Sequence, residues 1–416
     1  MKPDQQSILF KIWKYPQLSE TFITAQIITA IKCGYRVNIL VEDLCSIEDS
    51  KQNHLFEKYG LKERIILEDY GIPSGKISRY FLAMGLVIYN LPSLKKLRQF
   101  LKRKKKFEVR YIYEFHFYGK LKDYDLIHVQ FGTNARPLDL FKKIGLITSK
   151  LIVSFHGHDL YFPINGRISE EGYYDVLFKT ADLLAVNTRF LKDILIRLMA
   201  PHEKIVTIPV AVDTEYFFPL KQNTNELDRG IQLISVGRLV KYKGHRYGIE
   251  CVRKLKEKGY LVKYTIVGEG NQELELKNLI SKYDLKENIF LTGRKSQNEI
   301  RNLMCNSEIF LMTSITDPDY GAESQGLVTA EAQACGLPVI GFGSGGVKYT
   351  ISQGETGFIV PEKDVEAMME KIEVLITNPD LRRRLGEKAQ EFICENFSQK
   401  HINEVWRETY NNLITS

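Results

Sequence analysis

SITDPDYGAESQGLVTAEAQACGLPVI, residues 314–340, is the stretch that decides the fold of this chain. Apolar runs at 309–312, just before it, and at 339–340, at its end, are typical of buried parallel strands. Between them an acidic loop leads into a helix predicted over 326–334, which the Gly-Leu-Pro sequence ends. The pattern predicts a strand-loop-helix-strand unit, which is typical of an α/β protein with a parallel sheet.

Two glutamates of this stretch lie about two helical turns apart. Glu323 falls in the loop ahead of the helix, at the carboxyl end of a strand. Glu331 lies within the helix, about 12 Å further along the axis at 1.5 Å per residue. That separation suits two contacts along one extended ligand better than a shared proton or a shared metal ion. Either glutamate taken alone is more often an ordinary residue without a site.

The whole string resembles the signature of the family 4 glycosyltransferases, retaining enzymes that use nucleotide-sugar donors and have the two-domain GT-B fold. That signature is Glu-Gly-Phe-Gly/Pro, four further residues, Glu-Ala, a small residue, Gly, any residue and Pro-Val. Ser324 stands where the family usually has glycine. The residues that match are Glu323, Gly326, Glu331, Ala332, Gly336, Pro338 and Val339.

The resemblance implies a donor site around these residues. It implies that Glu331 binds the ribose hydroxyls of the donor and that Glu323 binds a hydroxyl of the donor sugar. It places Ser324, Gly326 and Leu327 beside them as further donor-binding residues.

The length of 416 residues is natural for two domains of roughly 200 residues each. Together with the resemblance, it predicts an α/β, GT-B fold of two Rossmann-like, doubly wound domains facing a central cleft. A polar run, KQNTNELDRG, predicts the hinge between them. The expected parts are an acceptor-side domain over 1–210, a linker over 211–230, a nucleotide-sugar-binding domain over 231–395, and a C-terminal helix over 396–416 that crosses back to the first domain. We expect Trp406 and Tyr410 to anchor that helix.

The composition is that of an ordinary globular protein, with 44% hydrophobic and 26% charged residues. Six cysteines without a close pair argue for reduced thiols in a cytoplasm, and no cluster of metal-ligating residues is apparent. No signal peptide is visible, and the longest apolar run, 81–91, has 11 residues against the about 20 that span a bilayer. We therefore expect a cytoplasmic protein without a metal ion or other cofactor, in which 81–91 is a core or interfacial segment.

One segment, 93–106, accounts for the net charge of +7, because it holds eight Lys or Arg residues and no acid. Leu94, Leu97 and Leu101 form an apolar stripe at helical spacing within it. That profile is typical of a basic amphipathic helix on the anionic inner face of a membrane. The alternative is a solvated helix that covers part of the N-terminal core. Nucleic-acid binding is a third option, which no known motif supports.

In the second half, a predicted strand at 232–236 ends in Gly237-Arg238, and Lys243 follows five residues later at the start of a helix. Two cations at a helix N-terminus form a cradle for a diphosphate. The string Gly-Arg-Leu-Val-x-x-Lys-Gly also matches a family motif almost letter for letter. By resemblance, Arg238 and Lys243 therefore bind the diphosphate.

Further glycine turns follow later strands of this half. Gly268 lies in a short turn after a strand, which alone is a weak phosphate signal. Gly293 and Arg294 stand where the family holds the nucleotide base through backbone groups. The glycine-rich run 341–346 can bring amides to a phosphate or sugar, but the acid that the family usually has shortly after it is replaced by Tyr349.

In the first half, the string His-Gly-x-Asp directly follows the apolar run 151–155. In family members the histidine at this point, here His156, faces the donor sugar and its phosphates. A histidine near a strand end is otherwise more often structural, and His128 matches a family motif without a clear role. We count His128 and Asp159 with the acceptor or phosphate loop.

The first strand of this half leads into a loop and a predicted helix over 20–32. Ser19 is the expected N-cap of that helix, and Glu20 suits the dipole in its first turn. Both residues are assigned to the same acceptor or phosphate loop. The string Pro-x-Leu-Ser-Glu-Thr-Phe-Ile resembles a subgroup of the family associated with exopolysaccharide assembly, of the colanic acid type.

The resemblance to the family implies a retaining glycosyltransferase for bacterial surface polysaccharide, whether exopolysaccharide or lipopolysaccharide. The expected donor is a UDP-sugar first and a GDP-sugar second, and the expected acceptor is a glycan, free or on a polyprenyl carrier. Arg238, Lys243, His156 and Glu323 are the expected catalytic residues. A sugar-nucleotide epimerase of similar fold, or an assembly protein that binds nucleotide without turnover, are the alternatives. A dehydrogenase is disfavoured because neither half has the dinucleotide fingerprint.

Overall fold

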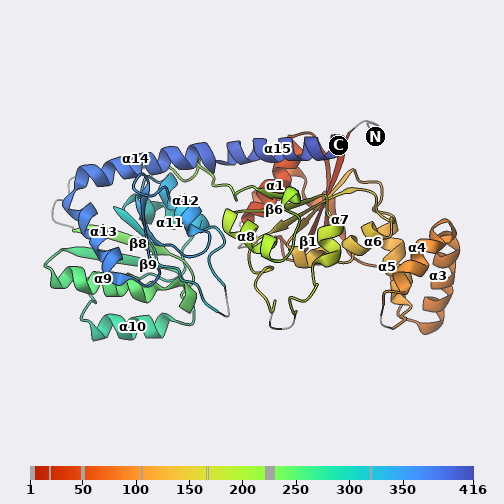
Figure 1. Ribbon diagram of the computed structural model, residues 1–416, viewed down its shortest axis with the longest axis horizontal. Coiled ribbons are helices and arrows are strands. Elements are labelled where there is room, and N and C mark those ends of the chain that lie inside the picture. The colour runs from red at the N-terminus through yellow and green to blue at the C-terminus, as the bar shows by residue number, and fades with distance from the viewer. Residues whose placement is uncertain are drawn as a thin grey trace. The chain divides into compact units, whose positions relative to one another are not determined.

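The computed structural model describes residues 5–17, 20–47, 52–104, 106–164, 166, 168–220, 230–318 and 321–416. The chain divides into two compact units. Unit 1 comprises Met1–Val186, Ile194–Thr207 and Asn403–Ser416, and unit 2 comprises Asn187–Asp193 and Ile208–Ile402. Each unit contains one parallel sheet with helices packed on it (Figure 1).

Unit 1 holds a seven-stranded sheet in the order β3-β2-β1-β4-β5-β6-β7, and every pair of neighbouring strands is parallel. The strands are β1 (Ser7–Tyr15), β2 (Arg36–Leu44), β3 (Ile65–Leu67), β4 (Leu126–Gln130), β5 (Lys150–Phe155), β6 (Leu183–Val186) and β7 (Ile205–Thr207). All five residues of β4 are buried. Continuous burial of this kind is typical of a parallel sheet with helices on both faces.

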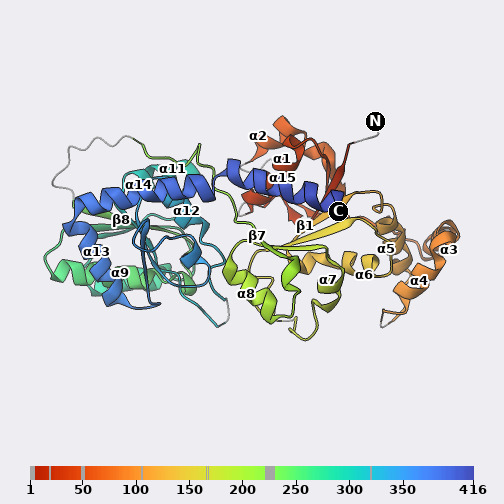
Figure 2. The ribbon, with the colours of Figure 1, turned by 45° about the horizontal axis from the view of Figure 1, so that its top comes forward.

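The helices of the first half of the chain vary in length. They are α1 (Thr21–Lys32), α2 (Asn53–Tyr59), α3 (Lys76–Tyr89), α4 (Leu94–Leu101), α5 (Arg110–Gly119), α6 (Leu138–Lys143), α7 (Asp175–Thr180) and α8 (Arg189–Arg197). The short 3-10 turn Leu91–Ser93 joins α3 to α4. In both ribbon views, α3 and α4 lie beside α5 at one end of unit 1 (Figures 1 and 2).

Unit 2 holds a six-stranded parallel sheet in the order β10-β9-β8-β11-β12-β13. Its strands are β8 (Ile231–Val236), β9 (Val262–Val267), β10 (Ile289–Leu291), β11 (Ile309–Met312), β12 (Val339–Phe342) and β13 (Gly357–Val360). One apolar core lies between the sheet and α9 (His245–Glu257), α10 (Glu273–Lys282) and α13 (Val365–Thr377). A second lies between the sheet and α11 (Gln297–Cys305), α12 (Leu327–Ala334) and α14 (Pro379–Asn396) (Figure 2).

The strand order reverses once in each sheet, between β1 and β4 in unit 1 and between β8 and β11 in unit 2. At such a switch point the loops after the two central strands leave in opposite directions, and ligands of doubly wound proteins bind at the carboxyl ends of the strands there. The loop that carries Arg238 and Lys243 follows β8, and the loop that carries Glu323 follows β11. The topology therefore brings these three residues to one edge of unit 2.

The last helix, α15 (Gln399–Thr415), joins the core of unit 1 from Asn403 onward. Tyr410 is fully buried, and its hydroxyl lies 2.9 Å from Nδ1 of His128 in β4. The Trp406 ring packs on the same imidazole, with centroids 5.0 Å apart. Thr29 of α1 donates a hydrogen bond of 2.6 Å to Asn403. Aromatic packing and polar contacts thus hold the C-terminal helix on unit 1.

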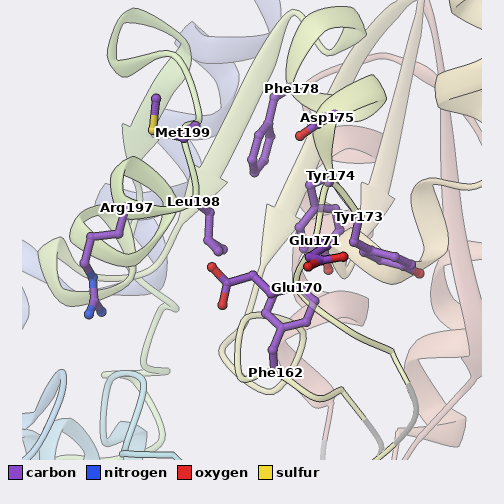
Figure 3. Close-up of a pocket in the computed structure, with 11 residues that line it drawn as sticks. Phe162, Glu170, Glu171, Tyr173, Tyr174, Asp175, Phe178, Arg197, Leu198 and Met199 are labelled. Atoms are coloured by element: carbon purple, nitrogen blue, oxygen red, sulfur yellow. The ribbon is translucent and has the colours of Figure 1, made fainter.

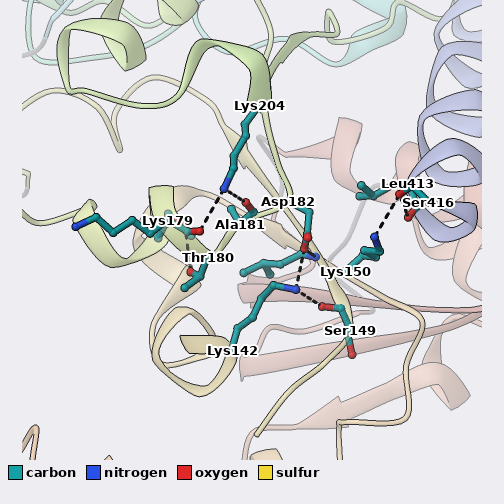
Figure 4. Close-up of polar contacts among 12 residues, drawn as sticks. Lys142, Ser149, Lys150, Lys179, Thr180, Ala181, Asp182, Lys204, Leu413 and Ser416 are labelled. Carbon is teal, nitrogen blue, oxygen red and sulfur yellow. Dashed lines mark hydrogen bonds and ion pairs between the residues drawn. The ribbon is translucent and has the colours of Figure 1, made fainter. Parts of the chain in front are cut away.

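Three lysines make polar contacts at the edge of unit 1 where its strands begin (Figure 4). The Lys204 ammonium donates hydrogen bonds to the carbonyls of Lys179 and Ala181, so it caps the C-terminal end of α7. Lys142 pairs with Asp182 at 2.8 Å, and Asp182 also accepts the amide of Leu151 at the start of β5. Lys150 reaches the Ser416 hydroxyl at 3.2 Å.

The predicted unit around the deciding stretch is confirmed. The strand predicted over 309–312 is β11, and the helix predicted over 326–334 is α12, with Gly326 at its N-cap. The expected α/β class is likewise confirmed by the two parallel sheets. No helix among the described residues combines the length and the apolar character that crossing a membrane requires.

The structure narrows one expectation for the helical part of unit 1 and corrects another. The run 81–91, expected as a core or interfacial segment, lies mostly in α3, where Ala83 is the only buried residue, so of these two it is not a core segment. The helix predicted over 93–106 is shorter, because α4 ends at Leu101. Its Leu97 and Phe100 are buried, with the Phe100 ring 4.7 Å from that of Phe141, so the apolar stripe packs inside unit 1. Lys105 lies outside the described residues.

The contact between Tyr410 and His128 can be tested by removing one hydroxyl. Tyr410→Phe leaves Nδ1 of a fully buried imidazole without this partner, so we expect the free energy of unfolding to fall by about 1–3 kcal/mol. Urea denaturation measures it. Tyr80→Phe is the control, because the Tyr80 side chain is exposed. Equal stability of the two variants would contradict the anchoring role.

Candidate active site

Two loops of unit 2, one after β8 and one after β11, pack against each other through their backbones. Gly244 adopts φ +63°, and a Cβ atom there would lie 2.1 Å from the carbonyl oxygen of Thr313. Thr313 in turn donates its hydroxyl to the carbonyl of Lys243 at 2.8 Å, and the amide of Ile315 donates to the carbonyl of Tyr242 at 2.7 Å. Glycine is required at 244, because any side chain would push the loops apart.

This packing places Lys243 beside Glu323. Their Nζ and Oε2 atoms are 2.5 Å apart, and both side chains are largely buried. Burial by itself would lower the pKa of Lys243, but the Glu323 carboxylate outweighs it, and the pKa is raised. The Ser314 hydroxyl lies 3.4 Å from the same carboxylate oxygen. The lysine therefore stays charged, and the pair presents a cation and an acid together at the switch point.

Arg238 lies on the same loop but is exposed. Its guanidinium donates a hydrogen bond of 2.7 Å to the Tyr242 hydroxyl. Lys241, two residues before Lys243, points to Asp317 at 3.8 Å and is largely exposed. The loop thus carries one buried and two exposed cations, and Lys241 pairs with the buried Asp317, whereas the guanidinium of Arg238 is exposed.

Gly237, Gly268 and Gly293 follow three neighbouring strands and form a row of tight turns. A Cβ atom at Gly268 would lie 1.9 Å from the carbonyl oxygen of Gly237. The Gly268 amide donates to the Gly293 carbonyl at 3.0 Å. Arg294 is exposed and lies 3.7 Å from Glu269. The need for glycine at 268 therefore comes from contact between backbones, so the turn is shaped by the fold itself.

The glycine-rich loop after β12 packs in the same way on the backbone of the Glu323 loop. A Cβ atom at Gly346 would lie 1.8 Å from the carbonyl of Ser324, and one at Gly345 would lie 2.3 Å from that of Glu323. The Gly346 amide donates to the Glu323 carbonyl at 2.7 Å. This contact fixes the main chain of Glu323. Because β11 lies between β8 and β12 in the sheet, the Gly346 loop and the Lys243 loop hold the Glu323 loop from opposite sides.

Helix α12 carries the second glutamate of the deciding stretch. Gly326 begins it in the left-handed conformation at φ 76°, and Leu327 is its first residue. The helix runs for only four residues from Leu327 to Glu331, which is a rise of about 6 Å along its axis. The stretch from Glu323 to Gly326 is not helical, so a helical rise describes only part of the separation of the two glutamates. Glu331 is half-buried, and burial raises its pKa to about 8.

In unit 1, His156 lies just beyond the end of β5. Its Nε2 lies 3.0 Å from Oε1 of Gln130, and its ring packs between those of Phe22 and Phe131. Nδ1 has no hydrogen-bond partner among the described residues. Burial lowers the pKa of His156 to about 3, so the ring is neutral at physiological pH. Because Nε2 donates its proton to Oε1 of Gln130, Nδ1 of the neutral ring carries no proton and can only accept a hydrogen bond.

Asp159 shapes the turn that presents His156. Its carboxylate is fully buried and accepts the amides of Gly132, His156 and Gly157 at 2.7–3.0 Å. It thereby ties the chain after β4 to the chain after β5. Asp159 is therefore a positioning residue. Its sequence-based assignment to the acceptor or phosphate loop is corrected in one respect, because its carboxylate binds backbone amides of the protein itself.

The remaining residues assigned to the acceptor or phosphate loop lie in different surroundings. Glu20, and not Ser19, occupies the N-cap position of α1, and its side chain makes no capping bond. Burial raises the pKa of Glu20 to about 7. Ser19 lies outside the described residues. His128 is fully buried under α15 with a pKa lowered to about 3 by burial, so it is a core residue and does not face a loop.

Sequence reasoning missed two buried polar residues near the Glu323 loop. His245 follows Gly244, and its Nε2 lies 3.2 Å from the carbonyl of Arg238, so it braces the cation loop. Burial lowers the pKa of His245 to about 4. Gln325 donates to and accepts from the backbone of Val210 at 2.9 and 2.8 Å. Gln325 joins segments 115 residues apart and His245 reaches a carbonyl seven residues away across a turn, so no local pattern signals either contact.

A second feature that the sequence did not indicate is a hollow of about 420 Å³ in unit 1 (Figure 3). Carboxylates and aromatic rings line it together. They are Phe162, Glu170, Glu171, Tyr173, Tyr174, Asp175 and Phe178, with Arg197 to Met199 on the other side. Concave sites with aromatic walls and a few polar groups are typical of small-molecule binding.

Comparison with known proteins identifies the family. The family model described as Glycosyl transferases group 1 matches residues 218–392, and the one described as Glycosyltransferase Family 4 matches residues 78–216. A glycosyltransferase of Haemophilus influenzae, itself uncharacterised, is 31% identical over 311 residues, which cover 67% of this chain and 84% of that protein. The chain belongs to the family 4 glycosyltransferases.

Other similar proteins match nearly the whole glycosyltransferase. The putative colanic acid biosynthesis glycosyltransferase WcaL of Salmonella typhimurium is 28% identical over 408 residues, covering 95% of this chain and 97% of WcaL. The crystal structure of Anabaena Alr3699/HepE in complex with UDP has a TM-score of 0.71 at 17% identity, covering 98% of this chain and 100% of that chain. This likeness confirms the predicted GT-B fold.

The raised pKa of Glu331 predicts how stability of the glycosyltransferase depends on pH. Because the folded pKa exceeds the unfolded value of about 4.3, the protonated carboxyl stabilises the fold at low pH, and this contribution is lost as pH rises toward 8. Glu331→Gln removes the ionisation. We therefore expect the free energy of unfolding of the variant, relative to that of the native chain, to rise by on the order of 1–3 kcal/mol as the pH is raised from 5 to 8.

Urea denaturation at the two pH values measures this gain without any ligand. Glu387→Gln is the control, because Glu387 is exposed on α14. A gain that is the same at pH 5 and pH 8 would show that Glu331 is ionised in the folded enzyme throughout.

Proposed function

We propose that this glycosyltransferase moves a hexose from a nucleoside-diphosphate sugar to a glycan acceptor during bacterial exopolysaccharide synthesis. The observation that carries the proposal is the buried Lys243–Glu323 pair with Arg238 on the same loop, at the switch point of unit 2. The UDP bound to the Anabaena protein supports a UDP-sugar as first donor, and a GDP-sugar is second. The colanic acid name of WcaL supports the exopolysaccharide role.

The two cations address the difficult part of the reaction, which is the departure of a nucleoside diphosphate from an oxocarbenium-like sugar. Negative charge builds on the leaving phosphate, and fixed cations in a water-poor site stabilise it most. Lys243 is charged and held in place by Glu323, so it needs little reorganisation. Arg238 is exposed, and its guanidinium would exchange the Tyr242 hydroxyl for a two-pronged contact with the diphosphate. In this scheme catalysis needs no metal ion.

The carboxylates bind the two ends of the donor. Glu323 accepts a hydroxyl of the sugar while it holds Lys243, and Glu331 accepts the ribose hydroxyls. His156 is the proposed contact of unit 1 with the donor sugar, and its Nδ1, which is buried and has no partner among the described residues, would accept a hydrogen bond from a sugar hydroxyl. Gly237, Gly293 and the Ser324–Leu327 backbone line the donor. The acceptor, a glycan free or on a polyprenyl carrier, binds to unit 1, and the reaction retains the anomeric configuration.

The diphosphate role predicts the effect of removing each cation. We expect Arg238→Ala and Lys243→Ala to lower kcat by on the order of 10²-fold or more, because a preorganised charge stabiliser is lost. Lys241→Ala is the matched control from the same loop, since its side chain is largely exposed and pairs with Asp317. Steady-state kinetics with UDP-sugar donors measures the change, and circular dichroism checks the fold.

Turnover unchanged in Arg238→Ala would remove the diphosphate role. Loss of activity of similar size in Lys241→Ala would show that the loop acts through its overall charge and not through two placed cations.

A second prediction concerns stereochemistry and metal ions. In the presence of EDTA, we expect undiminished transfer, and NMR of the product should show the same anomeric configuration as the donor. Inversion would refute the proposed geometry of attack on the leaving-group face. A rate that collapses in EDTA and returns with Mg²⁺ would show that the cations alone do not neutralise the diphosphate.

A further inference from the structure

Helix α3 is apolar on two faces, but unit 1 covers one of them. Its inner face packs through Ala83, with Leu86 and Val87 beside it, on Ile112 and Tyr113 of α5. The Tyr113 hydroxyl donates a hydrogen bond of 2.6 Å to a carbonyl of α3, which fixes this face on unit 1. A helix that is apolar all round is normally buried all round.

The outer face of α3 is exposed and consists of large apolar side chains at helical spacing. Ile77, Phe81, Met84 and Ile88 follow one another at intervals of three or four residues and are 60–75% exposed. Tyr80, Leu82, Tyr89, Leu91 and Phe107 are further large apolar side chains that are exposed. Eight of the nineteen large exposed hydrophobic side chains among the described residues lie between 77 and 91. An apolar patch concentrated in this way marks an interaction surface.

A hollow of about 270 Å³ opens within this surface. Tyr80, Phe81 and Met84 of α3 line one side of it, and Phe107 and Ile112 line the other. The hollow has almost entirely apolar walls, so water gains little there, and an apolar group that fills it removes further surface from water.

The charge around the patch identifies what covers it. Between Gly71 and Phe107 the chain has ten Lys or Arg residues and no Asp or Glu. Several of these cations, Lys95, Arg98, Lys102 and Arg103, are exposed on or just after α4, which the short turn Leu91–Ser93 joins to α3. Glu108, which is exposed directly after Phe107, is an acid next to this stretch, and the cations outnumber it. Exposed apolar side chains beside an excess of cations match a surface that offers anionic headgroups above hydrocarbon.

We propose that the outer face of α3 inserts into the interfacial layer of an anionic bilayer, while the basic residues after it contact the lipid headgroups. The apolar stripe of α4 itself packs inside unit 1, so α4 supplies charge and α3 supplies the apolar surface. A second copy of the chain is disfavoured as the occupant, because a symmetric contact through this face would bring the same cations together. The proposal does not depend on the donor or the acceptor.

Co-sedimentation of the full chain with vesicles tests the proposal without turnover. We expect binding to phosphatidylcholine vesicles that contain about 30% phosphatidylglycerol, and at least tenfold weaker binding to phosphatidylcholine alone. Raising the salt from about 0.1 M to about 0.5 M should weaken the binding, because screening shortens the reach of the cations.

Two sets of substitutions separate the apolar contribution from the charged one. Phe81→Ser with Ile88→Ser should weaken binding to anionic vesicles at least tenfold. The matched control is Leu261→Ser with Leu274→Ser, two exposed leucines of unit 2, which should bind like the native chain. Lys102→Gln with Arg103→Gln should weaken binding to anionic vesicles and reduce its salt dependence, because two of the four exposed cations named above are removed. Thermal unfolding should be the same in all variants, because every changed residue is exposed.

Three results would overturn the proposal. The first is no binding of the native chain to anionic vesicles. The second is native-like binding by the Phe81→Ser, Ile88→Ser variant. The third is self-association in sedimentation equilibrium that this variant abolishes while vesicles bind neither chain, which would assign the face to a second copy. Vesicle binding and sedimentation equilibrium do not require transferase activity. A failure of the proposed function can therefore be distinguished from a failure of the membrane proposal.

Discussion

The close approach of two backbones in unit 2 sets the position of the charged groups at the candidate site. Gly244 touches the carbonyl of Thr313, and this contact lets Lys243 meet Glu323 although 80 residues separate them in sequence. On the other side, Gly346 holds the main chain of Glu323. The ion pair therefore depends on hard-sphere contacts at glycines, and the electrostatics of the site follow from how densely the loops pack.

Much of the fold could be predicted from the sequence because its signals are local. Apolar runs gave β11 and β12, and the glycine and proline after 334 marked the end of α12. The cation loop and Glu323 could be found because each lies within a short contiguous motif. His245 and Gln325 could not, since their partners are a carbonyl seven residues away across a turn and a backbone segment 115 residues away. The spacing of the two glutamates could not be predicted from a helical rise alone, because the chain from Glu323 to Gly326 is not helical.

The histidines of unit 1 show why residue type alone is a weak guide. His128 and His156 are associated with neighbouring strands, and burial lowers the pKa of both. His128 lies within β4, so its side chain points to one face of the sheet and meets Tyr410, 282 residues later. His156 lies one residue past the end of β5, and its Nδ1 has no partner among the described residues. The position of each histidine relative to the end of its strand therefore distinguishes His128, which packs in the core, from His156, which is a candidate to bind a ligand.

The acid-free segment between Gly71 and Phe107 makes the chain electrically lopsided. It carries ten positive charges, whereas the net charge is +7, so the rest of the chain carries −3. A molecule of this kind does not behave in chromatography as its isoelectric point of about 8.8 suggests. Slightly above that pH the protein is anionic as a whole, but a sulfonate resin still retains it through the segment between Gly71 and Phe107. Its order of elution therefore reports the uneven distribution of charge rather than the net charge.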